Sequence, residues 1–185
     1  MIGIIDCGTR LMKEIKGNLQ GKDCKVIKLE ELEGYNFDSF SAIIISGSRT
    51  LLSEVNKEEY LKPFKFIKEI NIPVLGICLG HQIIGLLHGA EISHGELILR
   101  EEQIRILKEN PLFLNLENHS SFTEEHTEFI SLPENFELLA KSDSCENEAM
   151  KHPTKSIYSI QFHPEISGDN GKNIFENFLN ICRLI

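Results

Sequence analysis

The sequence predicts an α/β fold: a doubly wound, mainly parallel sheet flanked by helices, with an antiparallel extension. In the first half of the chain, short β-branched runs alternate with helical stretches, as in βαβ units. Some of these runs, such as Ala42–Ile45, are apolar at every position, which is typical of central strands covered on both faces. After about Glu91 the segments are strand-like without obvious helices between them, which indicates antiparallel strands.

The elements follow one another in an order that fits this class of fold. The expected strands of the first half are Ile2–Asp6, Lys25–Leu29, Ala42–Ser46 and Val74–Ile77, and its expected helices are Leu11–Leu19 and Lys57–Ile70. The expected β segments of the second half include Glu96–Arg100, Gln103–Leu107, Phe136–Ala140 and Ile157–Phe162. Apolar residues recur at helical spacing over Asn173–Cys182, which predicts a closing helix against the sheet. No repeat, low-complexity tract or linker interrupts residues 1–185, so we expect a single domain.

Composition and charge narrow the class of function. Hydrophobic residues make up 41% and charged residues 25% of the chain, as in ordinary globular proteins. The formal net charge of −9 repels phosphate backbones and anionic lipids, so neither nucleic acid nor a membrane is an expected partner. No signal segment or long apolar stretch is evident, which favours the cytoplasm.

Cysteine and histidine spacing favours no metal site. The five cysteines include no Cys-x-x-Cys pair and are interpreted as free thiols in a reducing compartment. Cys7 is interpreted as a core thiol. The spacing of His81, His88 and His94 does not favour a metal centre. The acidic pair Glu124-Glu125 is interpreted as solvated surface.

One segment predicts a nucleophile. An apolar strand leads into Gly76-Ile77-Cys78-Leu79-Gly80, and an apolar helical stretch follows, as in a nucleophile elbow with cysteine in place of serine. The two glycines are needed because a sharp turn leaves no room for Cβ atoms. The helix N-terminus would favour the thiolate form of Cys78. By itself, the motif equally permits a buried structural cysteine.

A second segment supplies a possible base. The strand-like run Ile157–Phe162 leads into His163-Pro164-Glu165. His163 can accept the thiol proton and return it to a leaving group, while Glu165 can hold the imidazole tautomer and stabilise its charged form. Pro164 restricts His163 to extended backbone geometry. By itself, this tripeptide is more typical of a surface turn.

Together, Gly-x-Cys-x-Gly-x-Gln, ending at Gln82, and His-Pro-Glu resemble the class I glutamine amidotransferases over nearly the whole chain. The resemblance implies their flavodoxin-like fold, with Cys78 as nucleophile, His163 as base and Glu165 orienting that base. It further implies an oxyanion hole made by the backbone N–H groups of Gly47 and Leu79, and contacts to bound glutamine from Ser48, Gln82 and His126.

Three motifs depart from the family pattern. Asp6–Arg10 replaces a Gly-Gly-Gln-Tyr type of segment, and Glu125–Glu128 replaces Ser-His-x-Asp. Ser46-Gly47-Ser48 replaces Gly-Gly-Pro, and the missing proline predicts a looser loop.

Within the family, the segment from Leu132 to Glu165 resembles the glutaminase part of GMP synthetase, which is a free-standing subunit in archaea. The matching residues are Leu132–Cys145, Glu148–His152, Ile157-Tyr158 and Gln161–Glu165. This resemblance implies that L-glutamine is hydrolysed through a Cys78 thioester and that ammonia passes to a separate ATP-pyrophosphatase subunit converting XMP to GMP. No Gly-x-x-x-x-Gly-Lys-Ser/Thr loop is present, so no cofactor is expected in this chain, and ATP and magnesium are expected only on the partner. The alternatives are a glutaminase for another acceptor, of the anthranilate or carbamoyl phosphate type, and a non-catalytic regulatory subunit with the same fold.

Overall fold

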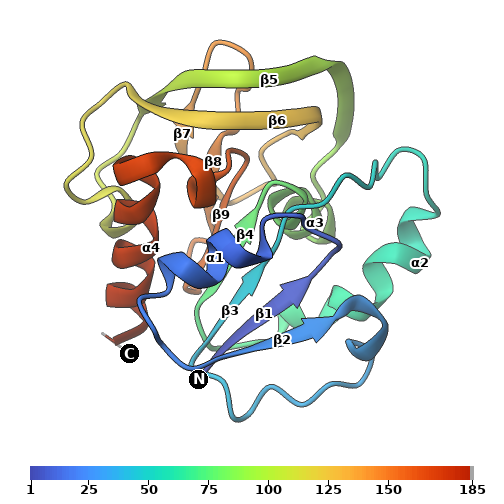
Figure 1. The fold of residues 1–185 in the computed structure, drawn as a ribbon. Coiled ribbons are helices and arrows are strands. Elements are labelled where there is room, and N and C mark those ends of the chain that lie inside the picture. Colours follow the sequence, from blue (N-terminus) through green and yellow to red (C-terminus); the bar gives the residue numbers. More distant parts are fainter. Residues whose placement is uncertain (184–185) are drawn as a thin grey trace.

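A computed structural model describes residues 1–183, which fold around one nine-stranded sheet of order β2-β1-β3-β4-β9-β8-β7-β5-β6 (Figure 1). The strands in one half of the sheet run parallel to one another, and those in the other half pair in antiparallel fashion. The parallel strands are β1 (Ile2–Asp6), β2 (Cys24–Lys28), β3 (Ala42–Ile45), β4 (Val74–Ile77) and β9 (Ile157–Ile160). The antiparallel strands are β5 (Ile92–Ile106), β6 (Ser120–Ile130), β7 (Glu137–Lys141) and β8 (Ala149–Lys151). The predicted fold class is therefore confirmed.

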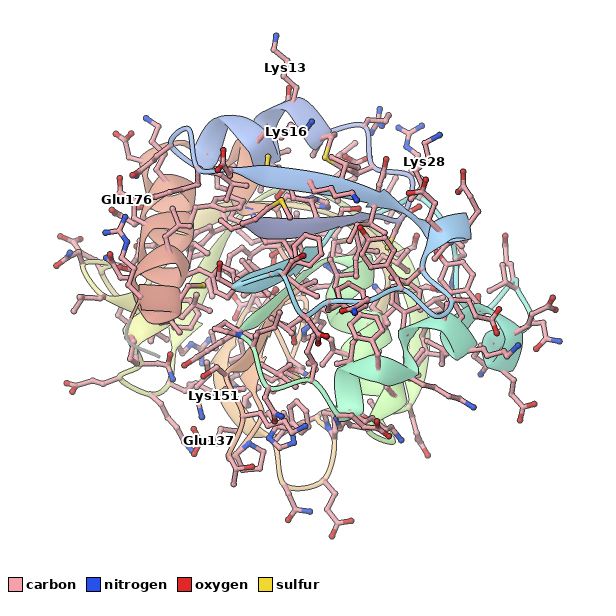
Figure 2. The ribbon with its side chains drawn as sticks, turned by 90° about the horizontal axis from the view of Figure 1, so that it is seen from below. Lys13, Lys16, Lys28, Glu137, Lys151 and Glu176 are labelled. Carbon is pink, nitrogen blue, oxygen red and sulfur yellow. The ribbon has the colours of Figure 1, made fainter. Side chains whose placement is uncertain are left out.

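Helices cover both faces of the parallel half. Alternate strand residues point to opposite faces: Ile4 and Ile44 pack with α1 (Met12–Asn18) and α4 (Gly168–Arg183). Ile5 and Ile45 pack with the 3-10 helix η2 (Lys62–Lys68) and with α3 (Leu79–Leu87). Shorter elements are η1 (Leu29–Glu31), α2 (Lys57–Leu61), η3 (Pro111–Phe113) and η4 (Pro164–Ile166). Charged side chains such as Lys13 on α1 and Glu176 on α4 project away from these layers (Figure 2).

Several expected elements differ in extent from the observed ones. The helix expected over Lys57–Ile70 divides into α2 and η2, because Pro63 has no backbone N–H to donate within a helix. Glu96–Arg100 and Gln103–Leu107 belong to the single strand β5, which has a register shift between His94 and Ile98. The closing helix α4 begins at Gly168, earlier than expected.

β6 was absent from the expected elements because its buried face is unusually polar. Its alternate residues Phe122, Glu124, His126, Glu128 and Ile130 are all buried, but three of the five are charged or polar. The usual alternation of apolar and polar residues is therefore missing.

The parallel strands bring four loops to one edge of the sheet. The carboxyl ends of β1, β3, β4 and β9 lie at this edge because these strands run in the same direction. Ligands of open α/β sheets bind at such an edge. No helix within residues 1–183 combines the length and apolar character needed to span a membrane.

Candidate active site

Cys78 occupies a strained turn between β4 and α3. Its φ of 50° and ψ of −104° are unfavourable for a residue with a Cβ atom, and such strain is common at functional sites. A Cβ atom on Gly76 would lie 2.6 Å from Gly80 O, and one on Gly80 would lie 2.5 Å from Ile45 O. Both glycines are therefore required by close backbone contacts, as the sequence predicts.

His163 and Glu165 form a buried pair beside this turn. His163 Nδ1 donates to Glu165 Oε1 at 2.9 Å, and the Glu165 side chain has no exposed surface. His163 N also donates to Thr123 O at 2.9 Å, which ties the histidine to β6. Glu165 reaches the imidazole from the 3-10 turn η4 rather than from extended backbone. The predicted pairing is present, and the turn after Pro164 creates it.

The environment of His163 favours its charged form. Burial by itself lowers the pKa of His163, but the neighbouring Cys78 and Glu165 outweigh it and raise this pKa well above the ordinary value of 6.5. A Cβ atom on Gly47 would lie 3.1 Å from His163 Cε1 and 3.3 Å from Cys78 Cβ. The predicted oxyanion glycine, nucleophile and base therefore meet at one point.

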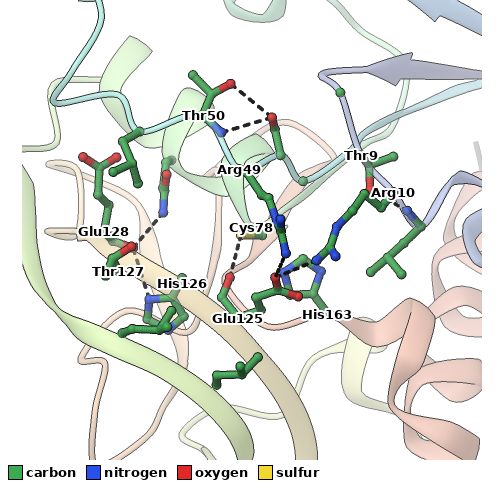
Figure 3. A pocket seen from close by; sticks show the side chains of 18 residues that line it. Thr9, Arg10, Arg49, Thr50, Cys78, Glu125, His126, Thr127, Glu128 and His163 are labelled. Atoms are coloured by element: carbon green, nitrogen blue, oxygen red, sulfur yellow. Dashed lines mark hydrogen bonds and ion pairs between the residues drawn. The ribbon is translucent and has the colours of Figure 1, made fainter.

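A cavity of about 290 Å³ opens onto Cys78 (Figure 3). Gly47, Ser48, Gln82, His126 and His163 line it, so the residues predicted to bind glutamine lie around the predicted nucleophile. Leu79 lies in the first turn of α3, where backbone N–H groups have no partner within the helix.

The loop after β3 is anchored by side chains, in contrast to the looser loop that the missing proline predicts. Ser48 Oγ accepts a hydrogen bond from Thr50 N at 3.2 Å. The carboxylate of Glu128, 1% exposed, accepts from Leu52 N at 2.7 Å and from Ser53 N at 2.9 Å. These hydrogen bonds restrain the loop in the way that the missing proline would.

Charged side chains at the cavity mouth were not among the predicted site residues. Glu125 Oε1 lies 2.8 Å from Arg10 Nη2 and 3.6 Å from Arg49 Nη2 (Figure 3). All three line the cavity. Arg10 and Glu125 belong to segments that depart from the family motifs, and Arg49 follows the third such segment. This departure was the only feature of the sequence that pointed to these three residues.

Glu124 is fully buried, so its interpretation as solvated surface was wrong. Burial raises the pKa of Glu124 to about 8 and that of Glu148 well above 4.5. His126 Nε2 lies 3.3 Å from Glu124 Oε2, and His126 Nδ1 lies 3.2 Å from Glu128 O. Because a carbonyl only accepts, His126 carries a proton on Nδ1. Its Nε2 is then unprotonated and lies beside the Glu124 carboxyl without forming a hydrogen bond.

The other thiols and histidines are interpreted from their burial. Cys7 is buried, and burial raises its pKa to about 12, as expected of a core thiol. His81 is fully buried with Nδ1 2.9 Å from Ser159 Oγ, and burial lowers its pKa to about 3. Within residues 1–183, no group of three or more His, Cys, Asp or Glu side chains is arranged to hold a metal ion.

A cysteine at a strained strand-to-helix turn, beside a buried His-Glu pair, is an arrangement suited to nucleophilic catalysis. The family is more specific: the sequence model described as glutamine amidotransferase class-I matches residues 3–182. The chain therefore belongs to the class I glutamine amidotransferases, and it is an enzyme of this type.

Individual relatives agree with the family. The chain is 43% identical over 156 residues to a subunit of glutamine-hydrolyzing GMP synthase from Methanosphaera stadtmanae, covering 83% of this chain and 79% of the relative. It is 37% identical over 191 residues to the protein of the same name from Pyrococcus abyssi, covering 98% of both. A crystal structure of a protein provisionally named as a GMP synthase subunit, from Thermoplasma acidophilum, superposes with a TM-score of 0.90 at 28% identity, over 99% of this chain and 94% of that one.

Proposed function

We propose that this chain hydrolyses L-glutamine to glutamate and ammonia through a γ-glutamyl thioester on Cys78. The ammonia would pass to a separate ATP-pyrophosphatase subunit that converts XMP to GMP. The similarity to the GMP synthase subunits, which extends over 98% of both chains for the Pyrococcus abyssi protein, is the main support for this acceptor. ATP and magnesium belong to the partner's reaction, and this chain needs no cofactor.

The site geometry suggests how each residue acts. Cys78 Sγ attacks the γ-carbonyl carbon after its proton has moved to His163, and His163 returns that proton to the departing ammonia. Glu165, which accepts from His163 Nδ1 at 2.9 Å, stabilises the imidazolium formed in between. Water then attacks the thioester and releases glutamate.

The backbone N–H groups of Gly47 and Leu79 would bind the oxyanion that forms in each step. Each donor would contribute about 2.7–4 kcal/mol to transition-state stabilisation. Ser48, Gln82 and His126 line the same cavity as Cys78 and would contact the rest of the glutamine molecule.

Glutamate release by the purified chain tests this proposal. The assay is run alone and with an ATP-pyrophosphatase subunit of GMP synthetase, ATP, magnesium and XMP. We expect hydrolysis to rise sharply with the partner and to be lost in Cys78→Ala, while GMP synthesis from added ammonia survives. If Cys78→Ala still consumed glutamine, the thioester mechanism would be wrong.

The other outcomes separate the alternatives. Hydrolysis that is indifferent to this partner would point to another acceptor, of the anthranilate or carbamoyl phosphate type. A glutamine-like electrophile that failed to label Cys78, with and without the partner, would point to a non-catalytic regulatory subunit.

A further inference from the structure

A chain of buried hydrogen bonds ends on the sulfur of Cys78. Gln82 Nε2 donates to Glu128 O at 2.7 Å and to Gln161 Oε1 at 3.2 Å. Gln161 Nε2 in turn donates to Cys78 Sγ at 3.6 Å. Gln161 is 0% exposed and Gln82 is 3% exposed, so water does not compete for these bonds.

The donor and acceptor roles in this series of hydrogen bonds are fixed at the end farthest from the sulfur. A side-chain amide can be turned over to exchange its oxygen and nitrogen, so its orientation must come from its partners. Glu128 O is a backbone carbonyl and can only accept, so Gln82 must present its nitrogen there. The second N–H of that nitrogen requires an acceptor, so Gln161 presents its oxygen to Gln82. The nitrogen of Gln161 is left facing the sulfur.

We propose that Gln161 is a further catalytic residue, whose amide N–H stabilises the Cys78 thiolate, and that Gln82 is the positioning residue that holds this amide in its donating orientation. The proposal rests on the role of Cys78 in the proposed function. A donor to sulfur favours the thiolate over the thiol, and hydrogen bonds to charged groups are stronger than those between neutral groups.

Other groups also face the Cys78 sulfur, and some favour its thiolate form while others favour its thiol form. His163, from the segment after β9, receives the thiol proton and favours the thiolate. Glu125 O on β6 lies 3.8 Å from Sγ and is an acceptor for the thiol form. The Glu125 carboxylate is paired with Arg10 and Arg49. Gln161 therefore supplies an uncharged donor to the sulfur, whereas the Glu125 carbonyl favours the neutral thiol.

The same chain limits how Gln82 can bind substrate. Both N–H groups of the Gln82 side-chain amide already donate hydrogen bonds, one to Glu128 O and one to Gln161 Oε1. Only Oε1 of Gln82 remains to contact glutamine in the cavity, so Gln82 would accept from the substrate rather than donate to it.

The test measures alkylation of Cys78 by iodoacetamide as a function of pH, with the labelled peptide identified by mass spectrometry. Gln161→Met removes the donor at similar volume, and Gln161→Glu replaces the amide nitrogen with an oxygen. We expect both variants to move the midpoint of alkylation upward by about one pH unit, which is about a tenfold lower rate at pH values below the midpoint. Gln82→Met should give a smaller upward shift, because the Gln161 amide becomes free to turn over.

Ser159→Ala is the matched control. Ser159 lies on β9, two residues before Gln161, is 1% exposed, and bonds to His81 rather than to the sulfur. This variant loses a buried hydrogen bond but should keep the wild-type midpoint. A wild-type midpoint in either folded Gln161 variant, or an equal shift in Ser159→Ala, would overturn the proposal. Alkylation does not require glutamine turnover, so failure of the proposed function would be detected separately.

Discussion

Gly47 shows how tightly the predicted catalytic residues are packed. Its α-carbon faces both the nucleophile and the base, and an added Cβ atom would lie 3.1 Å from His163 Cε1 and 3.3 Å from Cys78 Cβ. Contacts this short require one of the neighbours to move. The histidine and the cysteine sit on different segments, so any movement changes the distance between them.

We expect Gly47→Ala to lower kcat for glutamine hydrolysis by about 10²-fold, comparable to the loss of one oxyanion donor. Steady-state kinetics would measure this change, and chemical denaturation would test whether stability is retained. Gly17→Ala is the control, because an added Cβ atom on this α1 residue has nothing within 4 Å. It should leave kcat unchanged and slightly stabilise the helix. Equal kinetic effects of the two variants would contradict this explanation.

The sequence predicts Cys78, His163 and Glu165 because few residue types perform this chemistry and each stands in a recognisable motif. The sequence does not predict the role of Gln161, because the Gln161 amide is oriented by two residues that are distant in the chain. These are Gln82 on α3 and Glu128 on β6. It also misplaces Glu124, because nothing in the residues around Glu124 indicates that the strand turns this carboxyl inward.

At the scale of elements, β6 supports the loop after β3. The Glu128 carboxylate accepts two backbone N–H groups of that loop, and its own carbonyl accepts from Gln82. One residue therefore connects the oxyanion loop to the first turns of α3. The apolar parallel strands could be located from sequence, whereas this connection depends on a strand whose buried side is largely polar.

Glu128→Gln should loosen this loop. The amide keeps one acceptor oxygen, but its nitrogen would face a backbone N–H, so one of the two bonds is lost. We expect kcat to fall by about 3- to 10-fold, from a loss of roughly 1 kcal/mol, and hydrogen exchange at Leu52 and Ser53 to become faster. Glu54→Gln changes an exposed carboxyl in the same loop and should change neither. Unaltered exchange in Glu128→Gln would show that the carboxylate is not the anchor.

At the scale of the whole molecule, the site lies between the two halves of the sheet. The parallel half supplies Cys78 and His163, while β6 of the antiparallel half supplies His126 and Glu128 across the cavity. Contacts between the halves join residues far apart in the chain, such as Arg10 and Glu125. Local sequence patterns predict the parallel strands and part of the antiparallel half, but they contain no information on such pairings.

The buried acids of the antiparallel half make stability depend on pH. The pKa of Glu124 is raised by burial to about 8 in the folded protein, whereas the unfolded chain titrates near the ordinary value of 4.5. Between these values the folded state binds a proton that the unfolded state releases, so stability falls as pH rises. Glu148 acts in the same sense, since its pKa is also raised by burial.

Other groups define the window in which this fall is visible. The lowered pKa values of His81 and His126 increase stability as pH rises toward about 6.5, because the unfolded histidines are protonated below that value. The raised pKa of His163 reduces stability above about pH 6.5. A net decline is therefore expected between about pH 6.5 and 8, and a variant is needed to assign part of it to Glu124.

Glu124→Gln should flatten this decline. The amide is neutral at every pH and matches the protonated carboxyl in size and in having one donor group and one acceptor oxygen. One proton corresponds to about 1.4 kcal/mol per pH unit, so the variant should avoid a loss on the order of 2 kcal/mol between about pH 6.5 and 8. Urea denaturation at several pH values would measure this difference, with the exposed Glu134→Gln expected to follow the wild type. A slope in Glu124→Gln equal to that of the wild type would mean that Glu124 releases its proton in the folded state well below about pH 6.5. The decline would then have to come from Glu148 and His163.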